Sequence, residues 1–324
     1  MRETEDAATT LTRLLKTKLR VVKDDGNLAD VSVTGEWQNM EAFKSRDGQV
    51  TVGLAEGTDQ KLELTGKKRR RLQSLRVNVW ATNTAGSEES GRVMRREIVE
   101  EVLRVVRQNH VKPNVTVYDF LPNGSAWQPH KAYMGTIEAA PNGQGWTELD
   151  ATDYGKLWYS DDDRAQISIN GSGERAVMLS RFKVDSREKA LTNLVLSFEG
   201  YGTAPNGNGV AVKVWDHEAE AWENPESGGA DGVDDVLSIA LVATLPNYVD
   251  DDGFVWFLAE TISTSNGQTP AVLNCDYVSL TVTVNGITYC DILSYRDADR
   301  VDVKPFVYRT EITVKSWFFE NTGE

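Results

Sequence analysis

The charges of this 324-residue chain are divided unevenly along its length, and this division constrains its fold more than any other feature. Residues 1–118 carry 21 Lys and Arg against 17 Asp and Glu, whereas residues 119–287 carry 9 against 25. Residues 288–324 carry 5 against 7, and the formal net charge of the whole chain is −14. A strongly acidic stretch between two nearly balanced ones predicts a module with its own surface, inserted into a host domain.

Composition narrows the class of protein further. A hydrophobic fraction of 40% and a charged fraction of 26% are ordinary for a globular protein of about two domains. No apolar run reaches the 18–20 residues of a membrane span, and the polar N-terminus lacks the apolar core of a secretory signal. The only two cysteines, Cys275 and Cys290, are too few for a disulfide framework, so two buried thiols are favoured over a bridge.

The first flanking segment has the pattern of a helix, several strands and a second helix. Apolar residues recur at helical spacing near the N-terminus, which predicts an amphipathic helix capped by Thr9 or Thr10. These residues are Leu11, Leu14, Leu15 and Leu19. Strand-like runs follow at 30–37, 49–54, 61–65 and 75–80. Residues 92–109 form the strongest predicted helix, with Ile98 and Val102 on its apolar face.

The acidic middle segment has the pattern of an all-β module without helices. Prolines and glycines punctuate residues 113–129, which predicts a linker at its start. Beyond it, short strand-like runs alternate with Asn-Gly and Gly-Gly turns, which is typical of an antiparallel β-sandwich. The runs are 156–160, 165–169, 175–184, 191–200, 209–216, 236–244, 253–262 and 271–284.

The last segment alternates as a strand over 307–319, and it most simply completes the sheet begun before residue 118. The predicted fold class is therefore α+β. A discontinuous helix–sheet host domain, 1–118 with 288–324, carries an inserted all-β antiparallel sandwich of jelly-roll type at 128–286.

Few residues point to metal, cofactor or catalytic chemistry. His110, His130 and His217 lie far apart, so no zinc site and no cofactor is expected. The acidic runs 161–163 and 250–252 suit either a hard cation or solvated turns, and the consecutive spacing favours turns. No nucleophile elbow or phosphate-binding loop is present, so the chain is not expected to be an enzyme.

Tryptophans are frequent in the middle segment, and aromatic faces can stack on sugar rings. Trp215 and Trp256 stand among strand residues and are expected in the core. Trp146 and Trp222 stand in polar, turn-like surroundings, so they are the candidates for a glycan-binding surface.

A run of five cations, unusual in an acidic chain, precedes the predicted strand at 75–80. It consists of Lys67, Lys68, Arg69, Arg70 and Arg71. Three interpretations remain open: a solvated hairpin or loop, a contact with an acidic partner subunit, or contact with phosphate. No groove-binding motif accompanies the run, so sequence-specific recognition of nucleic acid is not expected.

The flanking segments resemble the tail-terminator (tail-completion) proteins of long-tailed viruses in the order of their elements. An N-terminal helix leads to the strand at 30–37, then to a hairpin ending in Val77-Asn78-Val79-Trp80, a long helix at 92–109 and a closing strand at 308–314. The resemblance implies a homohexameric ring at the head–tail junction of a virion. Such a ring has the tail tube protein below it and a head-side connector or stopper above it. The large insertion departs from the short form of that family.

The middle segment resembles jelly-roll and galactose-binding-like sandwiches, including carbohydrate-binding modules. The residues that carry this resemblance are 212–216 with Trp222, and the closing strand 276–282. Three functions follow as expectations. The first is a virion structural protein, made in the host cytoplasm, with an outward-facing acidic sandwich. The second is a glycan-binding adhesin, and the third is a carbohydrate-active enzyme with the sandwich as an accessory domain.

Overall fold

A computed structural model describes residues 3–24, 26–35, 46–64, 66–83, 90–121, 129–299 and 306–321. Nearly half of these residues lie in strands, and the chain divides into two compact units. We call Met1–Thr116 with Val284–Glu324 the split unit, and Val117–Thr283 the sandwich unit. The second unit thus begins at 117, whereas the sequence predicts a start at 128.

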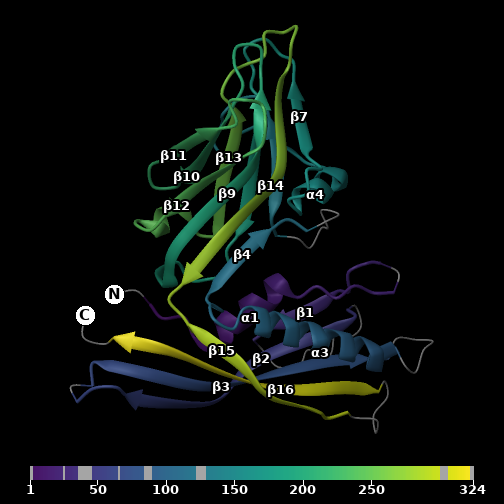
Figure 1. Cartoon of the computed structure of the whole chain (residues 1–324), viewed down its shortest axis with the longest axis vertical. Coiled ribbons are helices and arrows are strands. Elements are labelled where there is room, and N and C mark those ends of the chain that lie inside the picture. Colours follow the sequence, from purple (N-terminus) through teal and green to yellow (C-terminus); the bar gives the residue numbers. More distant parts are fainter. Residues whose placement is uncertain are drawn as a thin grey trace. The chain divides into compact units, whose positions relative to one another are not determined.

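The split unit contains a five-stranded sheet with the strand order β1-β2-β3-β16-β15 (Figure 1). Strand β1 is parallel to β2, and the other neighbours are antiparallel. The elements are α1 (Ala7–Lys18), β1 (Val31–Thr34), β2 (Gly48–Lys61), β3 (Lys68–Thr82), α3 (Ser90–Gln108), β15 (Tyr289–Asp297) and β16 (Val307–Asn321). Because β16 pairs with β3 along its whole length, the two ends of the chain share one sheet.

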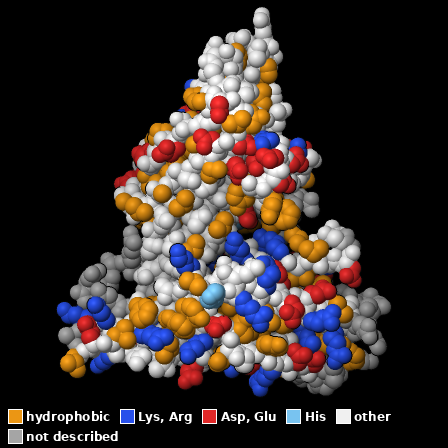
Figure 2. All heavy atoms as spheres, viewed as in Figure 1, with side chains coloured by type: hydrophobic (Ala, Val, Ile, Leu, Met, Phe, Trp, Pro, Cys, Tyr) orange, Lys and Arg blue, Asp and Glu red, His pale blue; other side chains and the backbone are white. Residues whose placement is uncertain are grey.

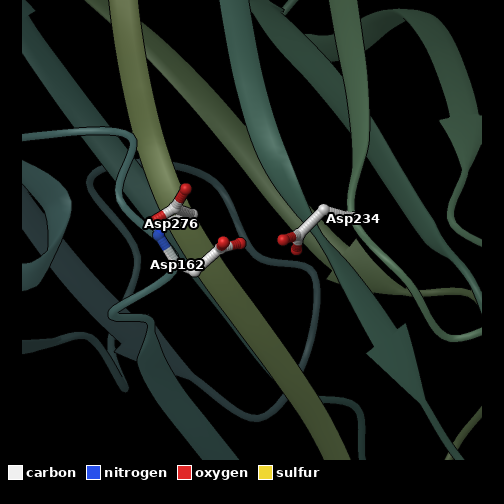
Figure 3. A group of neighbouring side chains, drawn as sticks. All are labelled: Asp162, Asp234 and Asp276. Carbon is white, nitrogen blue, oxygen red and sulfur yellow. Dashed lines mark hydrogen bonds between the residues drawn. The ribbon is translucent and has the colours of Figure 1, made fainter.

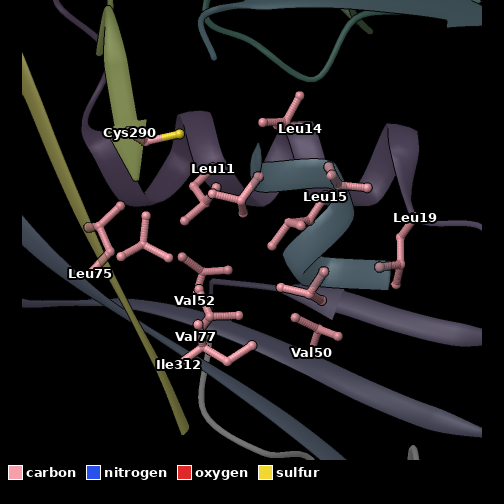
Figure 4. Close-up of a cluster of buried hydrophobic side chains, with 14 of the residues drawn as sticks. Leu11, Leu14, Leu15, Leu19, Val50, Val52, Leu75, Val77, Cys290 and Ile312 are labelled. Atoms are coloured by element: carbon pink, nitrogen blue, oxygen red, sulfur yellow. The ribbon is translucent and has the colours of Figure 1, made fainter. Parts of the chain in front are cut away.

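The core of the split unit lies between its two helices and one face of the sheet (Figure 4). Leu11, Leu14 and Leu15 of α1 are fully buried, as their helical spacing predicts. They pack with alternate strand residues such as Val52 and Ile312. Burial of such side chains contributes about 1.5–3 kcal/mol each, so this layer supplies most of the driving force for the unit.

Helix α1 begins one turn earlier than the threonine caps predict. Asp6 is the N-cap, and its carboxylate accepts a hydrogen bond from the Thr9 backbone N–H at 2.9 Å. Thr10 is instead buried and donates to Glu5 at 2.7 Å. Glu5 also forms an ion pair with Arg13 at 2.5 Å, and both side chains are almost wholly buried. The prediction of Thr9 or Thr10 as the cap was wrong because α1 already buries Thr10 against this pair.

Strands β2 and β3 of the split unit are longer than the sequence predicts. Strand β2 runs on to Lys61, past the predicted end at Leu54, and β3 begins within the cation run, at Lys68. The predicted strand at 61–65 was wrong, because residues 62–64 lie in the turn between β2 and β3. After an irregularity between Leu54 and Glu56, nearly all of β2 is exposed, so no apolar alternation marks it. Strand β15 was missed for the same reason. Of the predicted strand residues, 36–37 and 65 lie outside the described part of the chain.

The sandwich unit contains two sheets. The first has the order β11-β10-β13-β8-β5-β6 and is antiparallel throughout. The second has the order β12-β9-β14-β4, with β7 also paired to β14. The strands are β4 (Val115–Asp119), β5 (Lys131–Gly135), β6 (Thr147–Glu148), β7 (Ala165–Ile169), β8 (Val177–Lys183), β9 (Leu191–Thr203), β10 (Val210–Asp216), β11 (Ala221–Gly228), β12 (Asp235–Leu241), β13 (Phe254–Thr261) and β14 (Ala271–Val284). Alternate residues of these strands form the core, for example Leu196 of β9 and Val212 of β10.

The sandwich unit departs from its predicted pattern in several places, and β5 and β6 were not predicted at all. Residues 151–157 form a helix, α4 (Ala151–Leu157), capped by Asp150, so the predicted absence of helices and the predicted strand at 156–160 were wrong. The predicted linker 113–129 contains β4, whose alternate residues are buried; residues 122–128 lie outside the described part. Strand β11 was missed because it is exposed and contains Pro225, which an edge strand tolerates.

The two cysteines are free and buried, one in each unit, as the composition predicts. Burial raises the pKa of Cys290 to about 12 and that of Cys275 well above its usual value. No helix in the described residues has the length and apolar character needed to cross a bilayer.

The two units differ in charge. The sandwich unit carries 9 Lys and Arg against 25 Asp and Glu, a net of −16, whereas the split unit carries 26 against 24, a net of +2. On the face shown in Figure 2, acidic side chains gather on the sandwich unit and most basic ones lie on the split unit.

Candidate ligand-binding site

The outer face of the six-stranded sheet, opposite its core, carries a row of tryptophans. In β10 the buried valines alternate with half-buried residues, and this alternation turns Trp215 outward. Trp222 of β11 lies opposite Trp215, and the two ring centroids are 5.1 Å apart at an angle of 71°. On the other side, half-buried Trp256 of β13 follows. Three neighbouring strands thus present indole rings on one face.

The segment that connects β5 to β6 is fastened to this face by the indole N–H of Trp222, and the indole N–H of its own Trp146 forms a hydrogen bond within the segment. Trp222 Nε1 donates to the Ala139 carbonyl and Trp146 Nε1 donates to the Ala140 carbonyl, both at 3.0 Å. The Trp146 ring packs directly on Gly135, where an added Cβ would lie 2.6 Å from the ring. The close approach therefore requires glycine, and the segment is held in place without a ligand.

A cluster of charges reinforces the same segment. Lys213 Nζ lies 2.5 Å from Glu138 of the segment and 2.8 Å from Glu260 of β13. Glu260 is almost wholly buried and is also 3.3 Å from Arg175. Burial opposes the charge on Lys213, but hydrogen bonds to the two glutamates raise its pKa overall. The segment is thus tied to the sheet by charge as well as by the indoles.

A pocket of ≈ 370 Å³ lies among this segment, the sheet and the turns at its end. Its lining is Ala140, Pro141, Asn142, Trp215, His217, Glu220, Asp250 and Trp256. Two aromatic faces therefore stand beside an amide, an imidazole and two carboxylates. Concave sites with apolar walls and a few polar groups are the usual form of small-molecule sites.

The turn that carries His217 is built by a buried aspartate. Asp216 accepts hydrogen bonds from the backbone N–H groups of Glu218 and Ala219, both at 2.8 Å. The His217 N–H donates to the Asn247 carbonyl at 2.7 Å. Burial lowers the pKa of His217, although Asp250, Asp216 and Asp251 act to raise it. The imidazole is therefore neutral at pH 7 and can both donate and accept a hydrogen bond.

The pocket uses different tryptophans from those that the sequence singled out. Trp146 and Trp222 hold the segment beside the pocket but do not line it. Trp215 and Trp256, which the sequence places in the core, are half-buried and line it, so that expectation was wrong. The missed signal is the alternation of β10: since Val212 and Val214 face the core, Trp215 must face away.

The structure places the five-cation run in the β2–β3 hairpin of the split unit, far along the chain from the pocket. Lys67 and Lys68 are exposed near its turn. Arg69 forms an ion pair with Asp59 at 2.9 Å. The guanidinium carbon of Arg70 lies 4.9 Å from the Trp317 ring centroid, and that of Arg71 lies 5.5 Å from the Phe318 ring centroid. The arginines thus contact their own chain.

One run of acidic residues takes part in a carboxylate cluster (Figure 3). Asp162, Asp234 and Asp276 place one oxygen each within 4.8 Å of one another. Arg164 contacts both Asp162 and Asp234, and Asp276 accepts the backbone N–H of Asp162 at 3.1 Å. These three carboxylates are the described residues best placed to hold a cation, but the guanidinium already balances two of them. The sequence did not suggest Asp234 or Asp276.

One family model matches the chain, and it covers the sandwich. The model is described as "uncharacterized protein, C-terminal domain" and matches residues 128–284. No curated protein matches the chain. The family description names neither a ligand nor an activity.

Among solved structures, the chain is similar to the xylan-binding module CBM15, with a TM-score of 0.27 and 12% identity over 53% of this chain and 97% of that chain. A CBM4 structure has a TM-score of 0.24 and 11% identity, over 52% and 86%. The enzymatically active domain of tailspike protein 4 of bacteriophage CBA120 has a TM-score of 0.22 and 8% identity, over 52% and 19%. TM-scores this far below 0.5 do not establish a shared fold.

Proposed function

We propose that the sandwich unit binds carbohydrate in the pocket between Trp215 and Trp256. The observation that carries the proposal is the lining of that pocket. Indole faces match the apolar C–H faces of a pyranose ring. His217, Asp250 and the Asn142 amide supply hydrogen-bond donors and acceptors for hydroxyl groups.

The fastened segment supports the same function. Because the Trp222, Trp146 and Lys213 contacts already hold it, a ligand would meet a preformed wall. Preformed sites avoid the entropic cost of ordering loops and side chains on binding. The proposal assigns binding, and no catalytic step, to the chain.

The test is a carbohydrate-binding screen of the full chain with matched tryptophan variants. We expect Trp215→Ala and Trp256→Ala each to weaken binding at least tenfold, since each removes an aromatic wall. Trp158→Ala is the control, because Trp158 is 40% exposed in the same unit and does not line the pocket. Equal binding by the parent and both pocket variants would exclude the site.

We also propose a function for the split unit: it is an α+β host domain that carries the jelly-roll-like sandwich as an insertion and caps a viral tail tube. In this proposal the chain forms a homohexameric ring at the head–tail junction, between the tail tube protein and a head-side connector. The element order of helix, long hairpin, long helix and closing strand supports it. The two edge strands of its sheet, β1 and β15, support head-to-tail contacts between copies.

Particle imaging tests this second proposal. Antibody against residues 128–286 should label a collar at the head–tail junction of particles of the source virus, and purified chain should sediment as a closed ring. Label at the far end of the tail would favour the adhesin function instead. Unlabelled particles and a stable monomer would exclude the ring.

A further inference from the structure

Two neighbouring cations of β8 form no ion pair with Asp or Glu within the described part of the chain: Arg181 and Lys183. Five of the nine cations of the sandwich unit do form such pairs: Lys131, Lys156, Arg164, Arg175 and Lys213. Exposed Lys189 forms none either, but it lies outside the sheets. In a unit with a net charge of −16, two unpaired cations close together on one strand are a candidate anion site.

Aromatic rings hold both cations in place. The guanidinium carbon of Arg181 lies 4.4 Å from the Phe254 ring centroid and 5.5 Å from that of Trp256. Lys183 Nζ lies 4.8 Å from the same Phe254 ring centroid. These contacts orient the cations but do not neutralise them. Arg181 Nε is buried and has no hydrogen-bond partner among the described residues. The pair therefore carries positive charge that no carboxylate of the described residues neutralises.

Strand register connects these cations to the pocket. Trp222 lies opposite Trp215, Trp256 lies opposite Arg181, and Arg181 lies opposite Lys131. Val214 of β10 pairs with Phe257 of β13, so Trp215 and Trp256, the next residues on these antiparallel strands, are also neighbours. The row therefore continues across the five strands β11, β10, β13, β8 and β5. Neighbouring strands are about 4.8 Å apart, which is comparable with the length of one sugar residue in a chain.

The two ends of this row of side chains differ in charge. Glu220, which lines the pocket, belongs to the turn between β10 and β11. Arg181 belongs to β8, on the other side of β13. At one end, the Glu220 carboxylate can accept hydrogen bonds from sugar hydroxyl groups. At the other end, the Arg181 guanidinium can bind an anion. Trp215 and Trp256 lie between the two ends.

We propose that the ligand is an acidic oligosaccharide that lies across the strands, an inference that rests on the carbohydrate-binding function proposed above. One pyranose ring stacks on Trp215 and Trp256. The carboxylate of the neighbouring uronic acid accepts hydrogen bonds from Arg181, whose planar fork matches a carboxylate, and Lys183 adds a second positive charge.

The test compares acidic oligosaccharides with their own carboxyl-reduced forms, using the full chain in calorimetry at pH 7 and low salt. The probes are oligogalacturonate, oligoguluronate and oligomannuronate of equal length, each with its neutral reduced counterpart. We expect at least one acidic probe to bind about tenfold tighter than its counterpart, and this preference to shrink as salt rises. Equal affinity for both forms would overturn the inference and leave carbohydrate binding intact.

Variants test the preference for an acidic ligand separately from carbohydrate binding itself. Arg181→Gln should lower affinity for the acidic probe about tenfold and leave the reduced probe unchanged. Lys189→Gln is the charge-matched control, because Lys189 is an exposed cation of the same unit outside the sheet. Thermal unfolding by circular dichroism verifies that each variant is folded. If no acidic or reduced probe binds the parent chain, the inference fails, and the carbohydrate-binding screen described above decides whether the proposed function stands. If Arg181→Gln and Lys189→Gln bind the acidic probe equally, only the inference fails.

Discussion

Arginines rest on aromatic rings in both units, but the two settings differ. In the split unit, Arg70 and Arg71 cover Trp317 and Phe318 across paired strands of a long ribbon. In the sandwich unit, Arg181 lies at the end of a tryptophan row that leads to a pocket. The first arrangement was conspicuous in the sequence because its cations are consecutive. The second was invisible there, since alternation along a strand separates its cations. Adjacency in sequence is thus a poor guide to a charged site on a sheet.

The largest expected difference between the units is the stability that each loses when a cation beside its buried glutamate is removed. Among the described residues, Glu5 of the split unit has one cationic partner, Arg13, whereas Glu260 of the sandwich has both Lys213 and Arg175. Arg13→Met should destabilise the split unit by about 3–5 kcal/mol, because it leaves a buried carboxylate unpaired. Lys213→Met should cost less. Urea unfolding, followed through Cys290 labelling for one unit and Cys275 labelling for the other, measures both.

Two further variants make that comparison sharper. The double variant Glu5→Leu with Arg13→Met should recover most of the loss, since it removes both buried charges. Arg46→Met removes a half-exposed ion pair with Asp30 and should cost at most about 1 kcal/mol. A loss from Arg13→Met as small as that from Arg46→Met would show that the buried pair is not structural.

A smaller effect is expected at the helix caps. Asp6 caps α1 and Asp150 caps α4, each by accepting backbone N–H groups. Replacement by Ala should cost about 1 kcal/mol at either position. Asp6→Ala should lower only the stability of the split unit, and Asp150→Ala only that of the sandwich. Differential scanning calorimetry shows which transition moves; a shift of both transitions by one variant would mean that the units unfold together.

The cations on rings should have a still smaller effect on stability. Arg70→Gln should cost about 0.5–1 kcal/mol, the usual value of a surface cation–π contact. Arg70→Gln should leave carbohydrate binding unchanged, which distinguishes it from Arg181→Gln. Chemical denaturation and calorimetric titration of the same samples provide both values. Loss of carbohydrate binding in Arg70→Gln would contradict the distinction drawn between the two sites.

The smallest effect on stability at neutral pH is expected from the buried thiols. The folded-state pKa of Cys290 is about 12, above the ordinary value of about 8.5. Its contribution to stability is therefore fully present below about pH 8.5 and is lost as the pH rises toward 12. We expect no thiol labelling of the native chain at pH 8, and a falling stability of the split unit above pH 9. Cys290→Ser should remove that alkaline slope.

Much of the sheet structure was predictable because alternation marks strands with one buried face. Strand β14 was predicted at 271–284, the bounds that the structure has, because Val278, Leu280 and Val282 alternate with polar residues. The buried leucines of α1 were predicted for the corresponding helical reason. Strands β11 and β15 were missed because they are largely exposed, so neither face carries an apolar pattern.

The candidate site was less predictable, because it depends on segments that meet only after folding. Ala140 and Asn142 come from a connection that precedes β10 by some seventy residues, and no local signal links it to Trp215. Trp215 and Trp256 were assigned to the core from their apolar neighbours. Only the pairing of β10, β13 and β8 reveals that Trp256 stands beside Arg181.

Asn114 and Val284 exchange two hydrogen bonds: Asn114 Nδ2 donates to the Val284 carbonyl at 2.8 Å, and the Val284 N–H donates to the Asn114 carbonyl at 3.1 Å. They flank the 167 residues of Val117–Thr283. Closing a flexible loop of that length costs about 3 kcal/mol more than closing a turn of about four residues, on the (3/2)RT ln n scaling. If the sandwich folds first, α3 and β15 are joined by what is in effect a short connection. A module whose ends meet in this way could be exchanged for another during evolution with little penalty to the folding of its host.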